Sequence, residues 1–102
     1  MKIKSPQTLV QDALNQVKTI SASEALELSK KNECNLIDIR DAIELQKLGK
    51  IENSFNISRG LLEFSIHPES AYVQNSNLDP NKEMVLFCAA GGRSALAAKT
   101  LK

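Results

Sequence analysis

Residues 84–94 read Met-Val-Leu-Phe-Cys-Ala-Ala-Gly-Gly-Arg-Ser, and this stretch says most about the architecture of the chain. The apolar run predicts a buried strand that ends at Cys88, and the Ala-rich segment that follows predicts a helix. In that arrangement, backbone N–H groups at the start of the helix surround the Cys88 thiol. Because a helix N-terminus carries unsatisfied donors and a positive dipole end, it stabilises anions and lowers a thiol pKa. We therefore expect the chemistry of this chain at Cys88.

Length and composition limit the classes of protein that fit this chain. Its 102 residues, 42% of them hydrophobic, suffice for a single domain with one core. Thirteen Lys and Arg against twelve Asp and Glu give a net charge of +1, without the basic excess that binding to nucleic acid requires. The N-terminal segment has no signal-peptide pattern, and the longest apolar run, residues 84–90, is too short to span a bilayer. We expect a cytoplasmic protein with neither a nucleic-acid nor a membrane partner.

The cysteines and the histidine point away from disulfides and metals. Two cysteines, Cys34 and Cys88, cannot build a disulfide framework, and no spacing typical of a zinc site is present. Cys34 lacks the Gly-rich surroundings of Cys88, so we interpret it as a core residue. His67 is the only histidine, and its place before Pro68 indicates a cap or surface residue. We expect no metal and no cofactor.

The first half of the chain predicts two helices and a strand. Ser5-Pro6 has the pattern of an N-cap followed by Pro at the first helical position, which predicts an amphipathic helix within residues 1–18 that packs against a domain formed by residues 19–102. Its apolar side chains recur at helical spacing: Leu9, Val10, Ala13, Leu14 and Val17. A very short strand is expected near Thr19-Ile20, then a helix over 22–31 that begins with capping-box spacing, and a fully buried strand over 35–39.

The second half predicts further strands that alternate with helices. Asp41 can cap a helix that runs through Leu48 and stops at Gly49. The remaining elements expected are a strand over 54–57, helical segments over 60–66 and 69–74, a loop over 75–82, a strand over 83–87 and a helix from about 93 to the end. This alternation indicates an α/β domain with a mainly parallel central sheet flanked by helices. Ligands bind at the carboxyl ends of strands in such sheets, and Cys88 lies at one of them.

Several segments, in this order, resemble the rhodanese-like sulfurtransferase family. They are Leu36-Ile37-Asp38-Ile39-Arg40 with Glu44, the segment 49–54, Arg59-Gly60, and residues 88–94. The resemblance extends over most of the chain from Thr19 onward and implies a three-layer rhodanese-like fold. It also implies that Cys88 is a catalytic nucleophile, which takes a sulfane sulfur from a donor such as thiosulfate, holds it as a persulfide and passes it to a thiol or cyanide acceptor.

The residues around Cys88 suit that chemistry, because thiolate and persulfide are both anions. Backbone N–H groups can converge on the sulfur, and Gly91 and Gly92 permit the unusual dihedral angles of a tight ring. The Arg93 guanidinium suits an oxyanion such as the sulfonate of thiosulfate. Arg59 either lines the pocket entrance or is a surface charge, and Asp38 with Arg40 is interpreted as a structural pair. The predicted substrate-binding residues are Ala89, Ala90, Gly91, Gly92, Arg93, Ser94 and Arg59.

The sequence departs from the family pattern at two places. Lys50 and Glu52-Asn53 replace the usual His and Pro-Gly after Gly49, a change that we expect to alter the shape of the loop. The sequence also stops eight residues after Ser94, where the family continues with a strand that inserts into the sheet. We expect an unpaired edge beside the Cys88 strand, which tends to recruit another chain. A truncated chain, a homodimer that completes the sheet, and a different strand order are the alternatives.

Two other functions remain open from the sequence. A cysteine-loop phosphatase or arsenate reductase also surrounds a thiolate with backbone N–H groups, but its loop typically reads His-Cys-x5-Arg. In this chain four residues separate Cys88 from Arg93, and Phe87 stands at the position of the histidine. A noncatalytic rhodanese-like module that binds a partner or senses sulfur is the other alternative.

Overall fold

A three-stranded parallel sheet forms the centre of the described structure, a computed structural model that covers residues 1–67, 69 and 78–102. Its strands are β1 (Cys34–Asp38), β2 (Phe55–Asn56) and β3 (Glu83–Phe87), in the order β2-β1-β3. In the register of the sheet, Ile37 of β1 pairs with Phe55 on one side and with Leu86 on the other. The expected α/β fold with a parallel central sheet is confirmed.

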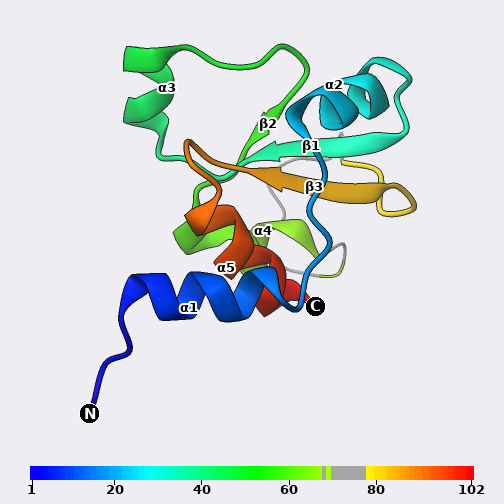
Figure 1. Cartoon of the computed structure of the whole chain (residues 1–102). Helices are drawn as coiled ribbons and strands as arrows, with labels where there is room; N and C mark the ends of the chain where they lie inside the picture. Colours follow the sequence, from blue (N-terminus) through cyan, green and yellow to red (C-terminus); the bar gives the residue numbers. More distant parts are fainter. Residues whose placement is uncertain (68, 70–77) are drawn as a thin grey trace.

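Helices cover both faces of this sheet, as Figure 1 shows. Two helices, α2 and α3, lie on one side; α4 and α5 lie on the other, and α1 packs against α5. The helices are α1 (Pro6–Leu14), α2 (Ala22–Lys30), α3 (Ala42–Leu48), the 3-10 helix η1 (Arg59–Leu61), α4 (Leu62–Ile66) and α5 (Gly92–Leu101). None of the helices in the described part of the chain is long and apolar enough to cross a bilayer.

The core lies around β1, which is buried on both faces because it is the central strand. Ile37 and the adjoining Ile39 have no exposed surface, and they pack with Ile57, Leu62 and Ala97. These residues come from the strand ends and from the two helices α4 and α5. Each fully buried aliphatic side chain contributes about 1.5–3 kcal/mol to folding. The core therefore fixes the positions of the strand ends, where the functional residues lie.

The helix starts follow the capping signals in the sequence. The Ser5 and Ser21 hydroxyls accept hydrogen bonds from the amides of Thr8 and Glu24, respectively, three residues further on. Helix α3 begins after Asp41 and ends at Gly49, whose φ of +84° is a conformation that favours glycine. The predicted bounds of these helices are confirmed to within a few residues.

Some predicted elements differ from the structure. Thr19-Ile20 is not a strand: a strand needs a neighbour to pair with, and this segment instead carries the chain from α1 across to α2 (Figure 1). Leu9 and Leu14 of the predicted apolar stripe remain 37% and 41% exposed, whereas Ala13 is buried. Strand β2 is limited to two residues. The helical segment predicted over 69–74 lies outside the described residues, apart from Glu69.

Within the described residues, β3 pairs only with β1 and is an edge strand. The Phe87 carbonyl accepts a hydrogen bond from the Ile39 amide at 3.0 Å, so the backbone groups of Phe87 face β1. Because successive residues of a strand alternate, the N–H and C=O groups of Met84 and Leu86 face the opposite edge. Pairing of this edge with a second copy of the chain remains a prediction.

Candidate active site

Cys88 lies at the carboxyl end of the sheet, between β3 and α5. Its thiol is partly buried, whereas Cys34 is buried at the start of β1. Five strand residues at about 3.3 Å each separate the two ends of the sheet by roughly 15 Å, which is too far for a disulfide. Both cysteines are free, and only Cys88 is placed where a ligand can reach it.

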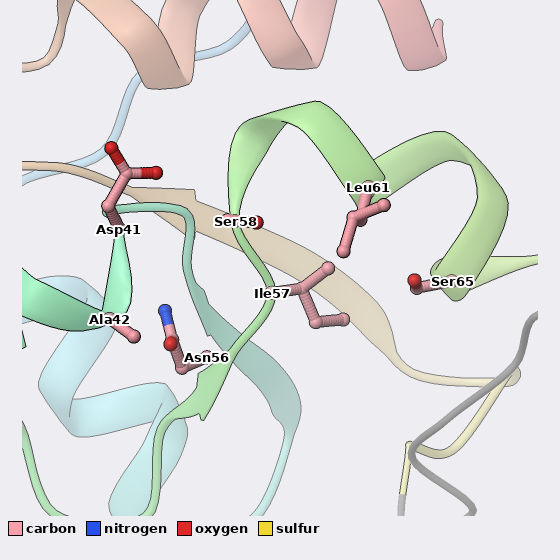
Figure 2. A pocket seen from close by; sticks show the side chains of 7 residues that line it. All are labelled: Asp41, Ala42, Asn56, Ile57, Ser58, Leu61 and Ser65. Atoms are coloured by element: carbon pink, nitrogen blue, oxygen red, sulfur yellow. The ribbon is translucent and has the colours of Figure 1, made fainter.

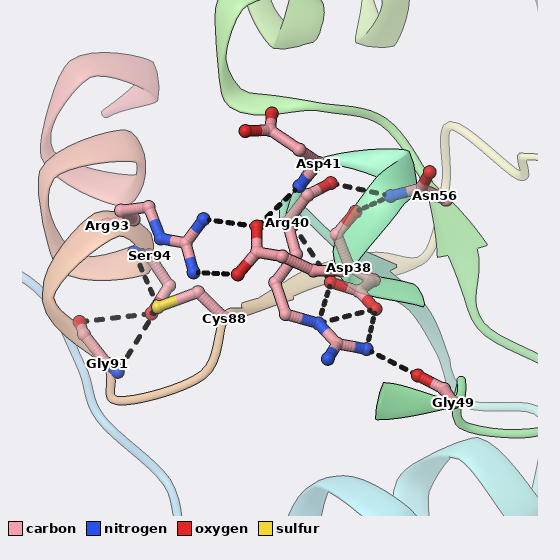
Figure 3. Close-up of polar contacts among 10 residues, drawn as sticks. Asp38, Arg40, Asp41, Gly49, Asn56, Cys88, Gly91, Arg93 and Ser94 are labelled. Carbon is pink, nitrogen blue, oxygen red and sulfur yellow. Dashed lines mark hydrogen bonds and ion pairs between the residues drawn. The ribbon is translucent and has the colours of Figure 1, made fainter. Parts of the chain in front are cut away.

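Backbone donors converge on the Cys88 sulfur (Figure 3). The Gly91 amide donates to Sγ at 3.2 Å and the Ser94 amide donates at 3.4 Å. Gly91 is the N-cap of α5 and has a φ of +90°, so the loop turns there through a conformation that L-residues rarely adopt. Helix α5 then begins at Gly92, and the positive end of its dipole lies beside the sulfur. This geometry stabilises a sulfur anion.

The Ser94 hydroxyl adds a donor that can change partners. The hydroxyl group donates to the Gly91 carbonyl at 3.1 Å, and its oxygen lies 3.5 Å from Cys88 Sγ. When Cys88 is a thiol, its S–H donates to the Ser94 oxygen. When Cys88 is a thiolate, the hydroxyl hydrogen can turn to the sulfur instead, because a charged acceptor forms the stronger hydrogen bond. Ser94 therefore serves both protonation states without a change of backbone.

The two thiols have opposite pKa shifts. Burial raises the pKa of Cys88, but the hydrogen bonds from the Ser94 side chain and from the amides of Ser94, Gly91 and Ala90 outweigh it, so the pKa is lowered. Burial and the nearby Glu83 carboxylate raise the pKa of Cys34. At neutral pH the thiolate fraction of Cys88 consequently exceeds that of Cys34, and a thiolate is the reactive form of cysteine.

Arg93 is held by Glu44 in a bidentate ion pair. Its two terminal nitrogens donate to the two Glu44 carboxylate oxygens, each at 2.8 Å, across a gap between α5 and α3. The same carboxylate accepts a hydrogen bond from the Asp41 amide at 2.9 Å. These contacts lower the pKa of Glu44 to about 2, with Arg93 as the main cause and the Asp41 amide next. Both terminal nitrogens of Arg93 are therefore already hydrogen-bonded to Glu44 in this structure.

A buried network lies beneath this ion pair. Asp38 has no exposed surface, and its carboxylate accepts three hydrogen bonds from the Arg40 side chain and one from the Arg40 amide. Arg40 also donates to the Gly49 carbonyl at 3.0 Å. The Asn56 amide nitrogen donates to the carbonyls of Asp38 and Arg40, which ties the end of β2 to the end of β1. Together these contacts give the sheet edge beside Cys88 a fixed shape.

The structure brings three of the six predicted loop residues to the sulfur and places Arg59 elsewhere. The amides of Ala90, Gly91 and Ser94 act on Cys88 directly. Arg59 donates to Glu63 at 2.7 Å and to Thr100 at 3.3 Å. Of the other predicted loop residues, Ala89 is exposed in the loop, Gly92 is the first residue of α5, and Arg93 forms the ion pair with Glu44.

The position of Thr100 decides how far Arg59 lies from the sulfur. Thr100 lies in the last turn of α5, roughly 12 Å along the helix from Gly92 at a rise of about 1.5 Å per residue. Arg59 therefore does not line the Cys88 loop in this structure. Its ion pair with Glu63, four residues away on the same helical segment, is that of a surface charge.

His67 lies outside the site, whereas two residues at the site, Glu44 and Asn56, were not predicted to act there. His67 is an exposed residue at the end of α4, and its Nδ1 accepts a hydrogen bond from the Glu69 amide. The roles of Glu44 and Asn56 were missed, although the spacing between Asp41 and Glu44 signals a capping box. The described residues contain no group of three or more His, Cys, Asp or Glu side chains that could hold a metal ion.

Comparison with known proteins identifies the family. The sequence profile described as "Rhodanese-like domain" matches residues 21–102. The chain belongs to this family. The match confirms the resemblance seen in the ordered segments from β1 to the Cys88 loop, and the parallel sheet with helices on both faces is the rhodanese-like fold.

A solved structure is similar to this rhodanese-like chain over nearly its whole length. It is a protein of unknown function from Rhodopseudomonas palustris CGA009, described as a possible tyrosine phosphatase. The two are 36% identical with a TM-score of 0.80, and the alignment covers 98% of this chain and 76% of the other. The comparison with curated protein sequences gave no match.

Proposed function

We propose that this rhodanese-like chain is a sulfurtransferase that carries sulfane sulfur on Cys88. The observation that supports this function best is the sulfur cradle, the backbone donors of the loop around Cys88. The amides of Gly91 and Ser94 lie within 3.4 Å of the sulfur, and the thiol pKa is lowered. A persulfide is an anion of the same charge as a thiolate, with its charge one atom further out. A preformed ring of N–H donors stabilises both forms without reorganisation.

The first half-reaction loads the sulfur. The Cys88 thiolate attacks the outer sulfur of thiosulfate, a new S–S bond forms, and the bond between the two sulfurs of thiosulfate breaks. Sulfite leaves with the electron pair of that bond, and the Cys88 persulfide anion remains. The amides of Gly91 and Ser94 donate to Cys88 Sγ, which is bonded to the outer sulfur that carries the charge of the persulfide. No general base is required, because the lowered thiol pKa supplies the thiolate.

The second half-reaction passes the sulfur on. A thiolate acceptor, or cyanide, attacks the outer sulfur of the persulfide, and the bond to Cys88 Sγ breaks. Cys88 leaves as a thiolate, so the donors that activated it as a nucleophile now stabilise it as a leaving group. The Ser94 hydroxyl can donate to it at that point, since its oxygen lies 3.5 Å from the sulfur. One cradle therefore serves both directions of transfer.

Sulfur loading tests the proposal directly. The protein is incubated with thiosulfate, and intact-mass spectrometry measures the gain of one sulfur atom. We expect the gain in the wild type and in Cys34→Ser, because Cys34 lies at the other end of the sheet, and we expect none in Cys88→Ser. Release of the added sulfur by cyanide or a small thiol tests the second half-reaction. A folded wild-type protein that gains no sulfur from thiosulfate or from an organic persulfide would instead favour the noncatalytic module.

A cysteine-loop phosphatase is the second candidate, favoured by the description of the structural neighbour from R. palustris as a possible tyrosine phosphatase. A phosphatase needs its arginine free to bind the phosphate oxygens, whereas both terminal nitrogens of Arg93 bind Glu44. The four residues between Cys88 and Arg93 also form a smaller ring than five would. Hydrolysis of a generic aryl phosphate that depends on Cys88 would favour this second function.

A further inference from the structure

Helix α1 packs along α5, the helix that begins at the sulfur cradle (Figure 1). At the start of α5, Val10 Cγ2 lies 3.6 Å from the position that a Cβ on Gly92 would occupy. At the end of α5, the Lys102 Nζ donates to the Gln16 carbonyl at 2.6 Å, just beyond the end of α1. The fully buried Ala13 lies between these two contacts along the chain. Helix α1 therefore follows α5 from its first residue to its C-cap.

The contact between Val10 and Gly92 lies at the cradle. Because glycine has no side chain, Val10 packs directly on the backbone of the first residue of α5. This residue lies between Gly91 and Ser94, whose amides donate to the Cys88 sulfur. Since the turns of a helix are linked by hydrogen bonds, a displacement of residue 92 also displaces these donors. Val10 thus contacts the segment that sets the distances between the amides and the sulfur.

Contacts from two other helices hold the first turn of α5. Glu44 of α3 binds Arg93, and Val10 of α1 packs on Gly92. A cavity of about 350 Å³ lies at the carboxyl ends of β1 and β2, as Figure 2 shows. The residues given as its lining lie between positions 41 and 65 and include none from the cradle or from α5. This cavity therefore contributes no contact to the start of α5, and the position of that turn depends on α3 and α1.

Helix α1 lies outside the segment that matches the family. The match to the rhodanese-like profile begins at residue 21, whereas α1 ends at Leu14. The alignment with the R. palustris structure covers 98% of this chain, so most of α1 has an aligned counterpart in that protein. The contact of Val10 with the cradle is consequently an addition to the features that the family profile describes.

From these contacts we infer that Val10 is a positioning residue for Cys88: by packing on Gly92, it holds the first turn of α5 where its amides reach the sulfur. The inference rests on the proposed sulfurtransferase function, because sulfur transfer is the reaction that the cradle serves. Val10 acts through Gly92 and not on the sulfur itself. When this contact is lost, the first turn gains freedom to move, the hydrogen bonds to the sulfur weaken, and the thiolate is less stabilised.

Val10→Ala tests the inference, because it removes the two methyl groups that reach Gly92 and retains a good helix former. Val10 is only partly buried, so the variant should fold, and circular dichroism checks this. The rate of alkylation of Cys88 by iodoacetamide is measured in the full chain over the pH range in which the thiol ionises. We expect the profile to move to higher pH and the rate at pH 7 to fall about two- to threefold, the lower limit of what one hydrogen bond contributes.

Leu14→Ala is the matched control on the same helix. Leu14 is 41% exposed and lies one turn beyond Val10, towards the other end of α5. Its loss should lower the free energy of unfolding but leave the pH profile of Cys88 unchanged. Val10→Thr keeps the branched shape of the side chain and should keep the wild-type profile.

A wild-type profile in folded Val10→Ala would overturn the inference, as would an equal shift in Leu14→Ala or in Val10→Thr. Failure of the proposed function has a different signature. If Val10→Ala shifts the alkylation profile as expected but the wild type gains no sulfur from thiosulfate or an organic persulfide, the positioning role of Val10 stands and the sulfurtransferase function does not.

Discussion

Arg93 and Glu44, 49 residues apart in the sequence, form two parallel hydrogen bonds of 2.8 Å that join the first turn of α5 to the first turn of α3. Arg93 follows Gly92 directly, so the pair holds the start of the helix on which the sulfur cradle depends. Glu44 is itself held by the Asp41 amide. The ion pair therefore couples the end of β1 to the shape of the Cys88 loop.

Glu44→Gln should lower the stability of the protein in a pH-dependent way. The pKa of Glu44 is lowered from 4.5 to about 2, so its ionised form stabilises the fold at pH values above about 4.5. This contribution is lost as the pH falls from about 4.5 to about 2. The difference in the free energy of unfolding between wild type and variant, measured with urea, should be constant near pH 7 and shrink between pH 4 and pH 2.5. A difference that is the same at all pH values would show that the charge of Glu44 is not involved.

Ser94→Ala should make Cys88 less reactive at neutral pH. The variant removes one donor to the thiolate and therefore raises the pKa of Cys88, so the alkylation profile moves to higher pH. The rate of reaction with iodoacetamide at pH 7 should fall by up to about tenfold, since a hydrogen bond to a charged group contributes about 1.5 kcal/mol before solvent weakens it. Cys34 is the internal control, because its buried thiol should stay unmodified in the native protein. An unchanged profile would mean that the hydroxyl stays on the Gly91 carbonyl.

Asp38→Asn should destabilise the protein strongly. The variant leaves the Arg40 guanidinium near the core without its counter-charge, and breaking a buried ion pair in this way costs about 3–5 kcal/mol. Glu63→Gln is the matched control, because it breaks the exposed pair with Arg59 and should cost less than about 1 kcal/mol. Urea denaturation at pH 7 measures both variants. Similar losses of stability in the two would contradict the structural interpretation of Asp38 and Arg40.

Local sequence signals predicted the parts of the fold that depend on neighbouring residues. The bounds of β3 match the predicted strand over 83–87, because an apolar run there lies between a polar loop and the Cys88 turn. Ser5, Ser21 and Asp41 mark the helix starts, because each lies immediately before a helical pattern. The position of Cys88 at a strand end, facing a helix start, follows from the same local pattern.

Local sequence patterns could not predict the contacts between segments that are distant in the sequence. The capping-box spacing places Glu44 on the first turn of α3, but nothing in it shows that the carboxylate meets Arg93. Because the sequence does not reveal this contact, the Arg93 guanidinium was expected to bind an anionic substrate. Asn56 has no local pattern that reveals its two bonds to the β1 end. Thr19-Ile20 failed as a strand because β propensity alone does not provide a pairing partner.

The two glycines of the loop give a matched pair for the final prediction. Both were expected to need unusual dihedral angles, but only Gly91 has a positive φ, whereas Gly92 is the first residue of α5. A Cβ at position 91 meets no atom within 4 Å, so the cost of Gly91→Ala comes from the backbone alone. A Cβ at position 92 lies 3.6 Å from Val10 Cγ2, an ordinary contact.

Gly91→Ala should therefore lower the free energy of unfolding by about 1–2 kcal/mol, the cost of an L-residue in a left-handed conformation. It should also slow the alkylation of Cys88, because relaxation of this turn moves the Gly91 amide away from the sulfur. Gly92→Ala should stabilise the protein by about 0.5 kcal/mol, since alanine loses less backbone entropy on folding, and should leave the alkylation rate unchanged. Urea denaturation and iodoacetamide kinetics measure both effects. Equal stability and reactivity in the two variants would show that the cradle does not depend on the turn at Gly91.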